Sequence, residues 1–385
     1  MKDTLNDLST LFDEAKEKRE FDFVQTLINY TGMGTKELST NLHEWFEAIE
    51  FYKTLYFQLL DKEKTRIGTL LYSTFFENSD FYNILGSLSK IKLGYKGSSY
   101  LFWKTKKYER LLGIGEKQDF LLELLDDAGK PNIIAFFEEN HHKEIRNTFF
   151  HSAYSLSEEE YVLHDSEPIQ IEGIGQYYFN VSEFLYPKIE NVIVFFDTFK
   201  KLYLESFSSY QADKLVDALF PNPCKAIILG SKDGLKGFRI ENSVQIYGKW
   251  YDSGVWYDEK DEFWAGHNIT PDFATIETIE INESLSRYEK KDDINKSDNE
   301  FQNIVDKILD RANSVEIERA TRLLVKFGDI RLKKMTAEEN VFKQKNFPKI
   351  ILPFYRQSVS LGSKFMDMSQ VNKNIETLEK FMTPQ

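Results

Sequence analysis

Two stretches of the chain repeat apolar side chains every three or four residues. The first runs from residue 35 to about residue 60, and the second runs from Ser182, a suitable helix N-cap, to about Tyr210. This spacing places apolar side chains on one face of an α-helix, and 32 Phe and 20 Tyr supply large rings to bury there. Both stretches therefore predict long amphipathic helices that pack into a sizeable core.

Shorter apolar repeats predict further helices. One or two short helices are expected within residues 1–30, and others from Lys62 to Phe76 and from Leu111 to Leu125. Pro131 suits the first turn of another helix, and the apolar positions after it form a packing stripe that reaches Phe149. We therefore expect one helix to run from Pro131 to about residue 149.

Alternation of apolar and polar residues predicts β-structure in two regions. Residues 155–179, with two glycines, predict two or three short strands. Residues 221–282 contain several strand-like runs separated by glycine-containing turns, and they predict a small sheet or partial barrel. Helical spacing returns from residue 301 onward.

These patterns together predict a mainly α protein with five successive regions. In order, they are an N-terminal helical segment (1–34), a helical bundle with a small β-insertion (35–212), a β-rich module (213–287), a polar linker (288–300) and a C-terminal helical segment with a basic and aromatic tail (301–385). A chain of 385 residues has room for two or three domains.

Composition limits the possible partners and location. The formal net charge of −13 argues against a surface that binds nucleic acid everywhere, so an RNA contact must use local basic patches. The single cysteine, Cys224, excludes an intramolecular disulfide and fits a reducing cytosol. Neither a signal peptide nor an apolar run long enough to cross a bilayer is recognisable. We therefore expect a cytoplasmic protein without a membrane partner.

Several signatures of cofactor enzymes are missing from the sequence. It contains no Walker-type glycine loop, no cysteine and histidine spacing typical of a metal site, and no nucleophile elbow. We therefore expect no cofactor and no metal ligands.

Residues 144–154 bring together an arginine, an amide and an imidazole between aromatic side chains. Asn147 and His151 are four residues apart and share a helix face, and the long Arg146 side chain can reach the same place. Arginine binds phosphate oxygens in bidentate fashion, and histidine exchanges protons near neutral pH. We call Arg146, Asn147 and His151 the Arg-Asn-His motif. It suits metal-independent RNA cleavage, in which a 2′-hydroxyl attacks its own phosphate and a cyclic phosphate results.

An Arg-Asn pair followed by three residues and a histidine, at the end of an aromatic-rich helix, resembles the signature of the HEPN superfamily (higher eukaryotes and prokaryotes nucleotide-binding). The likeness covers roughly residues 35–212. It implies a HEPN-like bundle, a homodimer in which two motifs face one cleft, and an endoribonuclease of bacterial antiviral defence, toxin or RNA-processing systems. By this resemblance Arg146 stabilises charge on phosphorus, Asn147 positions the phosphate and His151 transfers protons.

Other interpretations of the same residues stay open. Arg146 can form a surface ion pair with a nearby glutamate while His151 caps the helix end. His142 lies one turn before Arg146, and we consider it, with Tyr154, a candidate auxiliary group. The plainer interpretation of His142 and its neighbour His141 is a pair of exposed helix histidines.

A basic and aromatic segment lies between residues 80 and 109, where acidic residues are absent. Lysines can follow a phosphate backbone and aromatic rings can stack on bases, so we consider it an RNA-contacting surface. The alternative is a solvated hairpin with Gly94 and Gly97 at its turn. The RNA-binding candidates are Lys90, Lys92, Lys96, Trp103, Lys104, Lys106 and Lys107. A second such stretch, between residues 339 and 367, is weighed against a tail that packs on an acidic body.

The sequence thus predicts a metal-independent endoribonuclease that acts on RNA as a homodimer. The alternative is a non-catalytic HEPN-like module that dimerises, binds RNA or a nucleotide, and recruits a partner protein. A third, related hypothesis makes the chain the toxin half of a neutralised pair. The β-rich module has an acidic, tryptophan-lined loop at residues 258–264, which is a candidate contact for a regulatory protein or the solvated rim of an aromatic core.

Overall fold

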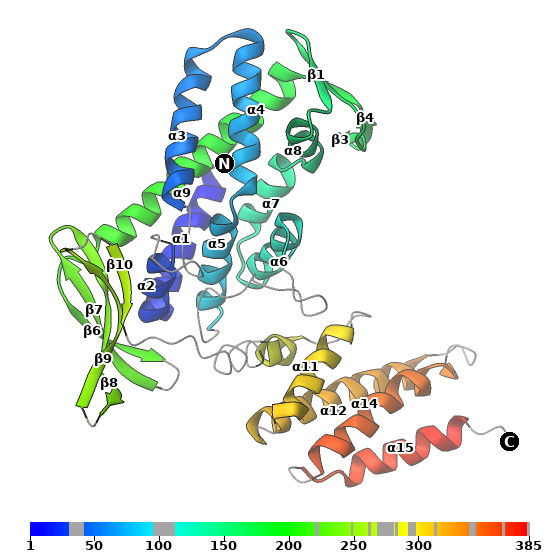
Figure 1. Ribbon diagram of the computed structural model, residues 1–385. Coiled ribbons are helices and arrows are strands. Elements are labelled where there is room, and N and C mark those ends of the chain that lie inside the picture. The colour runs from blue at the N-terminus through cyan, green and yellow to red at the C-terminus, as the bar shows by residue number, and fades with distance from the viewer. Residues whose placement is uncertain are drawn as a thin grey trace. The chain divides into compact units, whose positions relative to one another are not determined.

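The computed structural model divides the chain into two compact units, residues 1–271 and residues 272–385 (Figure 1). It describes residues 1–30, 42–94, 112–219, 223–247, 249–260, 263–267, 281, 284–291, 298–311, 314–338, 344–363 and 366–382. The chain is mainly α-helical, with a five-stranded antiparallel sheet and further helices towards the C-terminus. This confirms the fold class that the sequence predicts.

A bundle of helices forms most of the first unit. Its elements are α1 (Lys2–Lys18), α2 (Glu20–Ile28), α3 (Leu42–Gln58), α4 (Asp61–Glu77), α5 (Ser79–Lys92), α6 (Ile114–Asp127), α7 (Pro131–Asn140), α8 (Lys143–Phe150), the π-helical turn η1 (Val181–Leu185) and α9 (Tyr186–Ser208). Pro131 occupies the first turn of α7, as expected. In the parts of both units that are described, no helix is both long and apolar enough to cross a membrane.

Aromatic rings fill the centre of the bundle. The centroid of the Trp45 ring in α3 lies 5.2 Å from that of Phe196 in α9 and 5.7 Å from that of Phe75 in α4. Phe136 of α7 stacks on Phe195 of α9 at 4.2 Å. Such pairs add oriented contacts to the burial of large apolar surfaces. Side chains of α1 and α2 belong to the same core, so the first thirty residues pack within the bundle.

Short strands follow α8, and there are five of them where two or three were expected. They are β1 (Tyr154–Leu156), β2 (Glu160–Leu163), β3 (Ile169–Ile171), β4 (Ile174–Gln176) and β5 (Tyr178–Asn180). β1, β2 and β5 form one antiparallel sheet in that order, and β3 pairs with β4 as a hairpin. The insertion contacts α8 through β2, so it lies against the helix that carries the Arg-Asn-His motif.

The β-rich module is a five-stranded antiparallel sheet in the order β10-β9-β8-β7-β6. Its strands are β6 (Lys214–Leu219), β7 (Pro223–Ser231), β8 (Gly234–Ile246), β9 (Lys249–Asp258) and β10 (Phe263–His267). Phe21 of α2 meets Phe238 of β8 edge to face at 5.0 Å, and Phe207 of α9 meets Trp264 of β10 at 5.9 Å. The sheet therefore packs against the bundle, and Trp264 is part of that contact.

The second unit is helical. Its labelled elements are α11 (Asp298–Arg311), α12 (Ser314–Ala337), α14 (Phe347–Gly362) and α15 (Ser369–Met382). Phe347 and Phe354 pack against its two apolar cores, and Tyr355 is fully buried and donates a hydrogen bond to Asp329 at 2.7 Å. Of these three aromatic residues, Tyr355 therefore belongs to the core of the unit, and Phe347 and Phe354 are partly buried against it.

Candidate functional site

The helix expected from Pro131 to residue 149 is broken into α7 and α8. His141 and His142 have extended backbones, with ψ angles of 110° and 105°, and they separate the two helices. The buried Tyr72 hydroxyl of α4 donates to the Asn140 carbonyl oxygen at 2.6 Å and accepts from the His142 N–H at 2.7 Å. These two hydrogen bonds satisfy the Asn140 carbonyl and the His142 N–H at the break between the helices. They also fix the start of α8 on the bundle.

A column of aromatic rings fixes the other end of α8. Phe149 stacks on Tyr154 at 5.6 Å, and Tyr154 stacks on Tyr161 at 5.0 Å. Tyr161 stacks in turn on Phe179 at 5.1 Å, and its hydroxyl lies 3.1 Å from the Thr148 hydroxyl. The ring of Tyr154, predicted as an auxiliary group, is therefore a packing element between α8 and the β-insertion.

Arg146 is held from two sides. Its Nη1 lies 2.8 Å from Oε1 of Glu77 at the end of α4, and its side chain is 20% exposed. Its Nε and Nη2 donate to the Asn147 Oδ1 at 3.2 and 2.7 Å. Each terminal nitrogen of a guanidinium carries a second N–H, which these contacts do not use.

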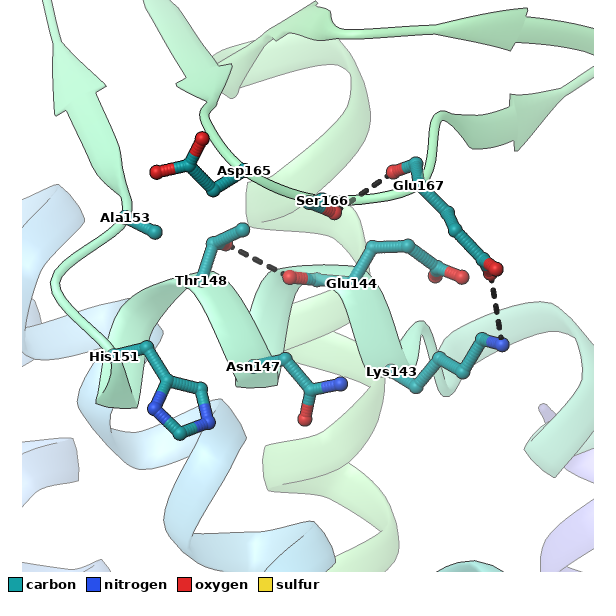
Figure 2. Close-up of a pocket in the computed structure, with 9 residues that line it drawn as sticks. All are labelled: Lys143, Glu144, Asn147, Thr148, His151, Ala153, Asp165, Ser166 and Glu167. Carbon is teal, nitrogen blue, oxygen red and sulfur yellow. Dashed lines mark hydrogen bonds and ion pairs between the residues drawn. The ribbon is translucent and has the colours of Figure 1, made fainter.

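Asn147 and His151 lie next to each other along one side of α8 and line an open groove of about 530 Å³ (Figure 2). Both side chains are exposed, and His151 is the C-cap residue, whose N–H donates to the Asn147 carbonyl oxygen at 3.0 Å. We call this cavity the α8 groove. It is lined by Lys143, Glu144, Asn147, Thr148, His151, Ala153, Asp165, Ser166 and Glu167.

The structure brings the motif residues together in pairs. Arg146 bonds to Asn147, and Asn147 shares the groove with His151, but Arg146 is not among the residues that line the groove. The alternative interpretation also has its elements in place, because Arg146 pairs with Glu77 and His151 caps α8. The geometry is therefore compatible with a phosphate site whose guanidinium is anchored by a glutamate.

The facing wall of the groove comes from the loop between β2 and β3. It carries Asp165, Ser166 and Glu167, and Glu167 pairs with Lys143 of α8 at 3.2 Å. Sequence reasoning missed this wall and missed Glu77. The acidic run after β2 is visible in the sequence, but only the tertiary fold places it opposite α8.

The two histidines between α7 and α8 are largely buried, which corrects their interpretation as exposed residues. Burial lowers the pKa of His141 to about 3, and its ring lies 4.5 Å from that of Phe76. Burial also lowers the pKa of His142 to about 4, and its ring lies 5.2 Å from Phe184. His142, predicted as an auxiliary group, is therefore neutral near pH 7 and does not line the groove.

Two of the predicted RNA-binding lysines belong to the packing of α5. Lys90 is buried at 6% exposure, and Lys92 pairs with Glu14 of α1 at 2.8 Å and donates to the Ala128 carbonyl oxygen. These two residues therefore do not form an exposed basic surface, and residues 79–92 form a helix where part of a hairpin was considered. The other candidates, Lys96, Trp103, Lys104, Lys106 and Lys107, lie outside the described residues.

Comparisons with protein-family models, with curated proteins and with solved structures found no match for this chain. Within the described ranges, no three side chains of histidine, cysteine, aspartate or glutamate gather to hold a metal ion. The candidate site is therefore defined by the geometry of α8 and its groove.

Proposed function

We propose that the chain is a metal-independent endoribonuclease whose site is the Arg-Asn-His motif at the α8 groove. The observation that carries this proposal is the exposed pair of Asn147 and His151 on one groove wall, with Asn147 bonded to the Arg146 guanidinium. An imidazole that reaches solvent can exchange protons, and a guanidinium one residue away can stabilise charge on phosphorus. The resemblance to the HEPN superfamily points to the same three residues.

The proposed reaction is a transfer within the RNA strand. The His151 imidazole takes the proton of a 2′-hydroxyl, and the 2′-oxygen forms a bond to the adjacent phosphorus. The bond from phosphorus to the 5′-oxygen breaks, and the His151 imidazolium returns its proton to that oxygen, so the products are a 2′,3′-cyclic phosphate and a 5′-hydroxyl. Arg146 stabilises the phosphate during this step, and Asn147 orients it. Glu77 keeps the guanidinium beside α8.

The proposal includes a homodimer in the cytoplasm. The HEPN resemblance implies two copies of the motif around one cleft, and a second copy would complete the open side of the α8 groove. A chain with one cysteine fits a reducing compartment. A role in defence, as a toxin or in RNA processing rests on the resemblance to the HEPN superfamily alone.

The test is incubation of the full chain with mixed RNA in EDTA. Wild-type protein is expected to cleave the RNA to products with cyclic phosphate ends, and His151→Ala is expected to abolish cleavage. The matched control is His43→Ala, which removes another exposed histidine, on α3. Folded wild-type protein that leaves the RNA intact under these conditions would contradict the proposal.

A second candidate function is RNA or nucleotide binding without turnover, with recruitment of a partner through the β-rich module. It is favoured by the ion pair between Arg146 and Glu77, which neutralises part of the charge that catalysis needs. Under this hypothesis wild-type protein binds RNA without cleaving it, and His151→Ala binds equally well.

A further inference from the structure

The two ends of the α8 groove differ in chemistry. Glu144 lies near the start of α8 and Asn147 and His151 lie towards its end, while Asp165 lies on the facing loop. Lys143 pairs with Glu167, which neutralises that third carboxylate. Glu144 and Asp165 form no hydrogen bond or ion pair through their carboxylates with any residue that the structure describes. Both are therefore available as acceptors for a ligand.

Glu144 and the two polar residues of the motif lie along one side of the same helix. Glu144, Asn147 and His151 are spaced at positions i, i+3 and i+7, so their side chains follow one face of α8. Glu144 and His151 are separated by about 10 Å along the helix axis. A nucleotide can therefore lie lengthwise in the groove, with its phosphate at one end and its base at the other.

The charges of the groove residues determine the orientation in which a nucleotide binds. A phosphate next to the carboxylate of Glu144 would be repelled, whereas the amide and imidazole end accepts it. The base then lies beside Glu144, where an ionised carboxylate can only accept hydrogen bonds. The base that fits best is the one that presents adjacent N–H donors.

Guanine meets this requirement. Its Watson–Crick edge carries the N1–H and the N2 amino group side by side, so the two carboxylate oxygens can accept both in bidentate fashion. Adenine and cytosine offer one amino group beside a ring nitrogen that repels a carboxylate, and uracil places carbonyl oxygens on both sides of its single N–H.

We propose that the α8 groove selects guanine in single-stranded RNA and that Glu144 is the residue that determines this specificity. This inference rests on the proposed function and names its substrate: an RNA strand with an unpaired guanosine whose phosphate lies at Asn147 and His151.

The test measures binding, so it does not depend on turnover. The probes are fluorescent 2′-O-methyl oligonucleotides of uridine with one central guanosine, inosine, adenosine or cytidine, which lack the attacking 2′-hydroxyl. In EDTA, the full chain is expected to bind the guanosine probe about tenfold more tightly than the all-uridine probe. Inosine lacks the N2 amino group and is expected to lose most of that gain.

The variants assign the specificity to a residue. Glu144→Gln is expected to abolish the preference for the guanosine probe over the all-uridine probe, because the amide offers a single acceptor oxygen and cannot accept both N–H groups. The matched control is Asp127→Asn, which changes an exposed carboxylate on α6, outside the groove. Circular dichroism of each variant verifies that it is folded.

Three outcomes overturn the inference. They are equal binding of all probes, a preference that Glu144→Gln leaves intact, and a preference that only Asp165→Asn removes. Cleavage of RNA in EDTA without base preference would contradict the inference alone. A guanosine preference without any cleavage would support the inference and contradict the proposed endonuclease.

Discussion

Tyr72 stabilises the start of α8, although it lies far from the Arg-Asn-His motif in the sequence. Its hydroxyl joins the Asn140 carbonyl and the His142 N–H, the two backbone groups that flank the helix break. Tyr72→Phe leaves both groups buried without this partner, and we expect a loss of about 1 to 3 kcal/mol in the free energy of unfolding. Urea unfolding followed by circular dichroism measures it.

The matched control for Tyr72→Phe is Tyr177→Phe, which removes the hydroxyl of an exposed tyrosine. We expect that variant to stay within about 0.5 kcal/mol of wild type. Equal effects of the two substitutions would show that the bonds at the break do not hold α8 in place.

Buried histidines make the stability of the chain depend on pH. The pKa values of His141 and His142, lowered by burial to about 3 and about 4, mean that the unfolded chain binds more protons than the folded chain below about pH 6.5. The free energy of unfolding therefore decreases as pH falls from about 6.5 towards 3. Burial raises the pKa of Asp22 to about 6, which opposes this trend between about pH 4 and 6, because there only its folded form holds a proton.

Because two histidines lower the free energy of unfolding on acidification and one aspartate raises it, we expect a net loss of stability from pH 7 to pH 4. His141→Phe keeps a ring beside Phe76 and removes one titrating group, so its free energy of unfolding is expected to fall less steeply. Urea unfolding at a series of pH values measures both slopes. Parallel curves for wild type and variant would contradict the assignment to His141.

At the scale of elements, helices α12 and α14 approach closely at a glycine. A Cβ added to Gly328 of α12 would lie 2.5 Å from Cε1 of Tyr355 in α14. That ring cannot easily move, because its hydroxyl donates to Asp329 and accepts from Asn374 at 3.3 Å. We expect Gly328→Ala to reduce the free energy of unfolding by about 1 to 3 kcal/mol.

The control for Gly328→Ala is Gly115→Ala in α6, where an added Cβ meets no atom within 4 Å. The same substitution at Gly115 is expected not to reduce the free energy of unfolding, because alanine favours a helix more than glycine does. Urea unfolding of the full chain compares the two variants. A Gly328→Ala protein as stable as wild type would contradict the close packing of α12 on α14.

Elements with long apolar repeats could be predicted from the sequence, and elements that depend on distant contacts could not. α9 follows from an uninterrupted repeat. The break between α7 and α8 depends on the Tyr72 hydroxyl, which lies some 70 positions earlier in the chain. Lys90 looked like part of a basic surface because its neighbours are basic and aromatic, yet it is buried in α5. Local sequence cannot tell which face of such a helix packs.

For the whole molecule, sequence spacing anticipated the shared face of Asn147 and His151 but not the complete site. Helix geometry alone brings those two side chains together. Glu77, which anchors Arg146, and the loop at residues 164–168, which forms the facing wall, come from segments that only folding brings to α8. The motif could therefore be found from the sequence, and its surroundings required the structure.

The most direct measurement of the proposed function is the rate at which full-length protein cleaves single-stranded RNA in EDTA, with enzyme in excess. The proposed function predicts that His151→Ala slows this rate by about a hundredfold or more, because a proton-transfer group is lost. His43→Ala is expected to cleave at the wild-type rate. Equal rates for wild type and His151→Ala would contradict the assignment of RNA cleavage to the α8 groove.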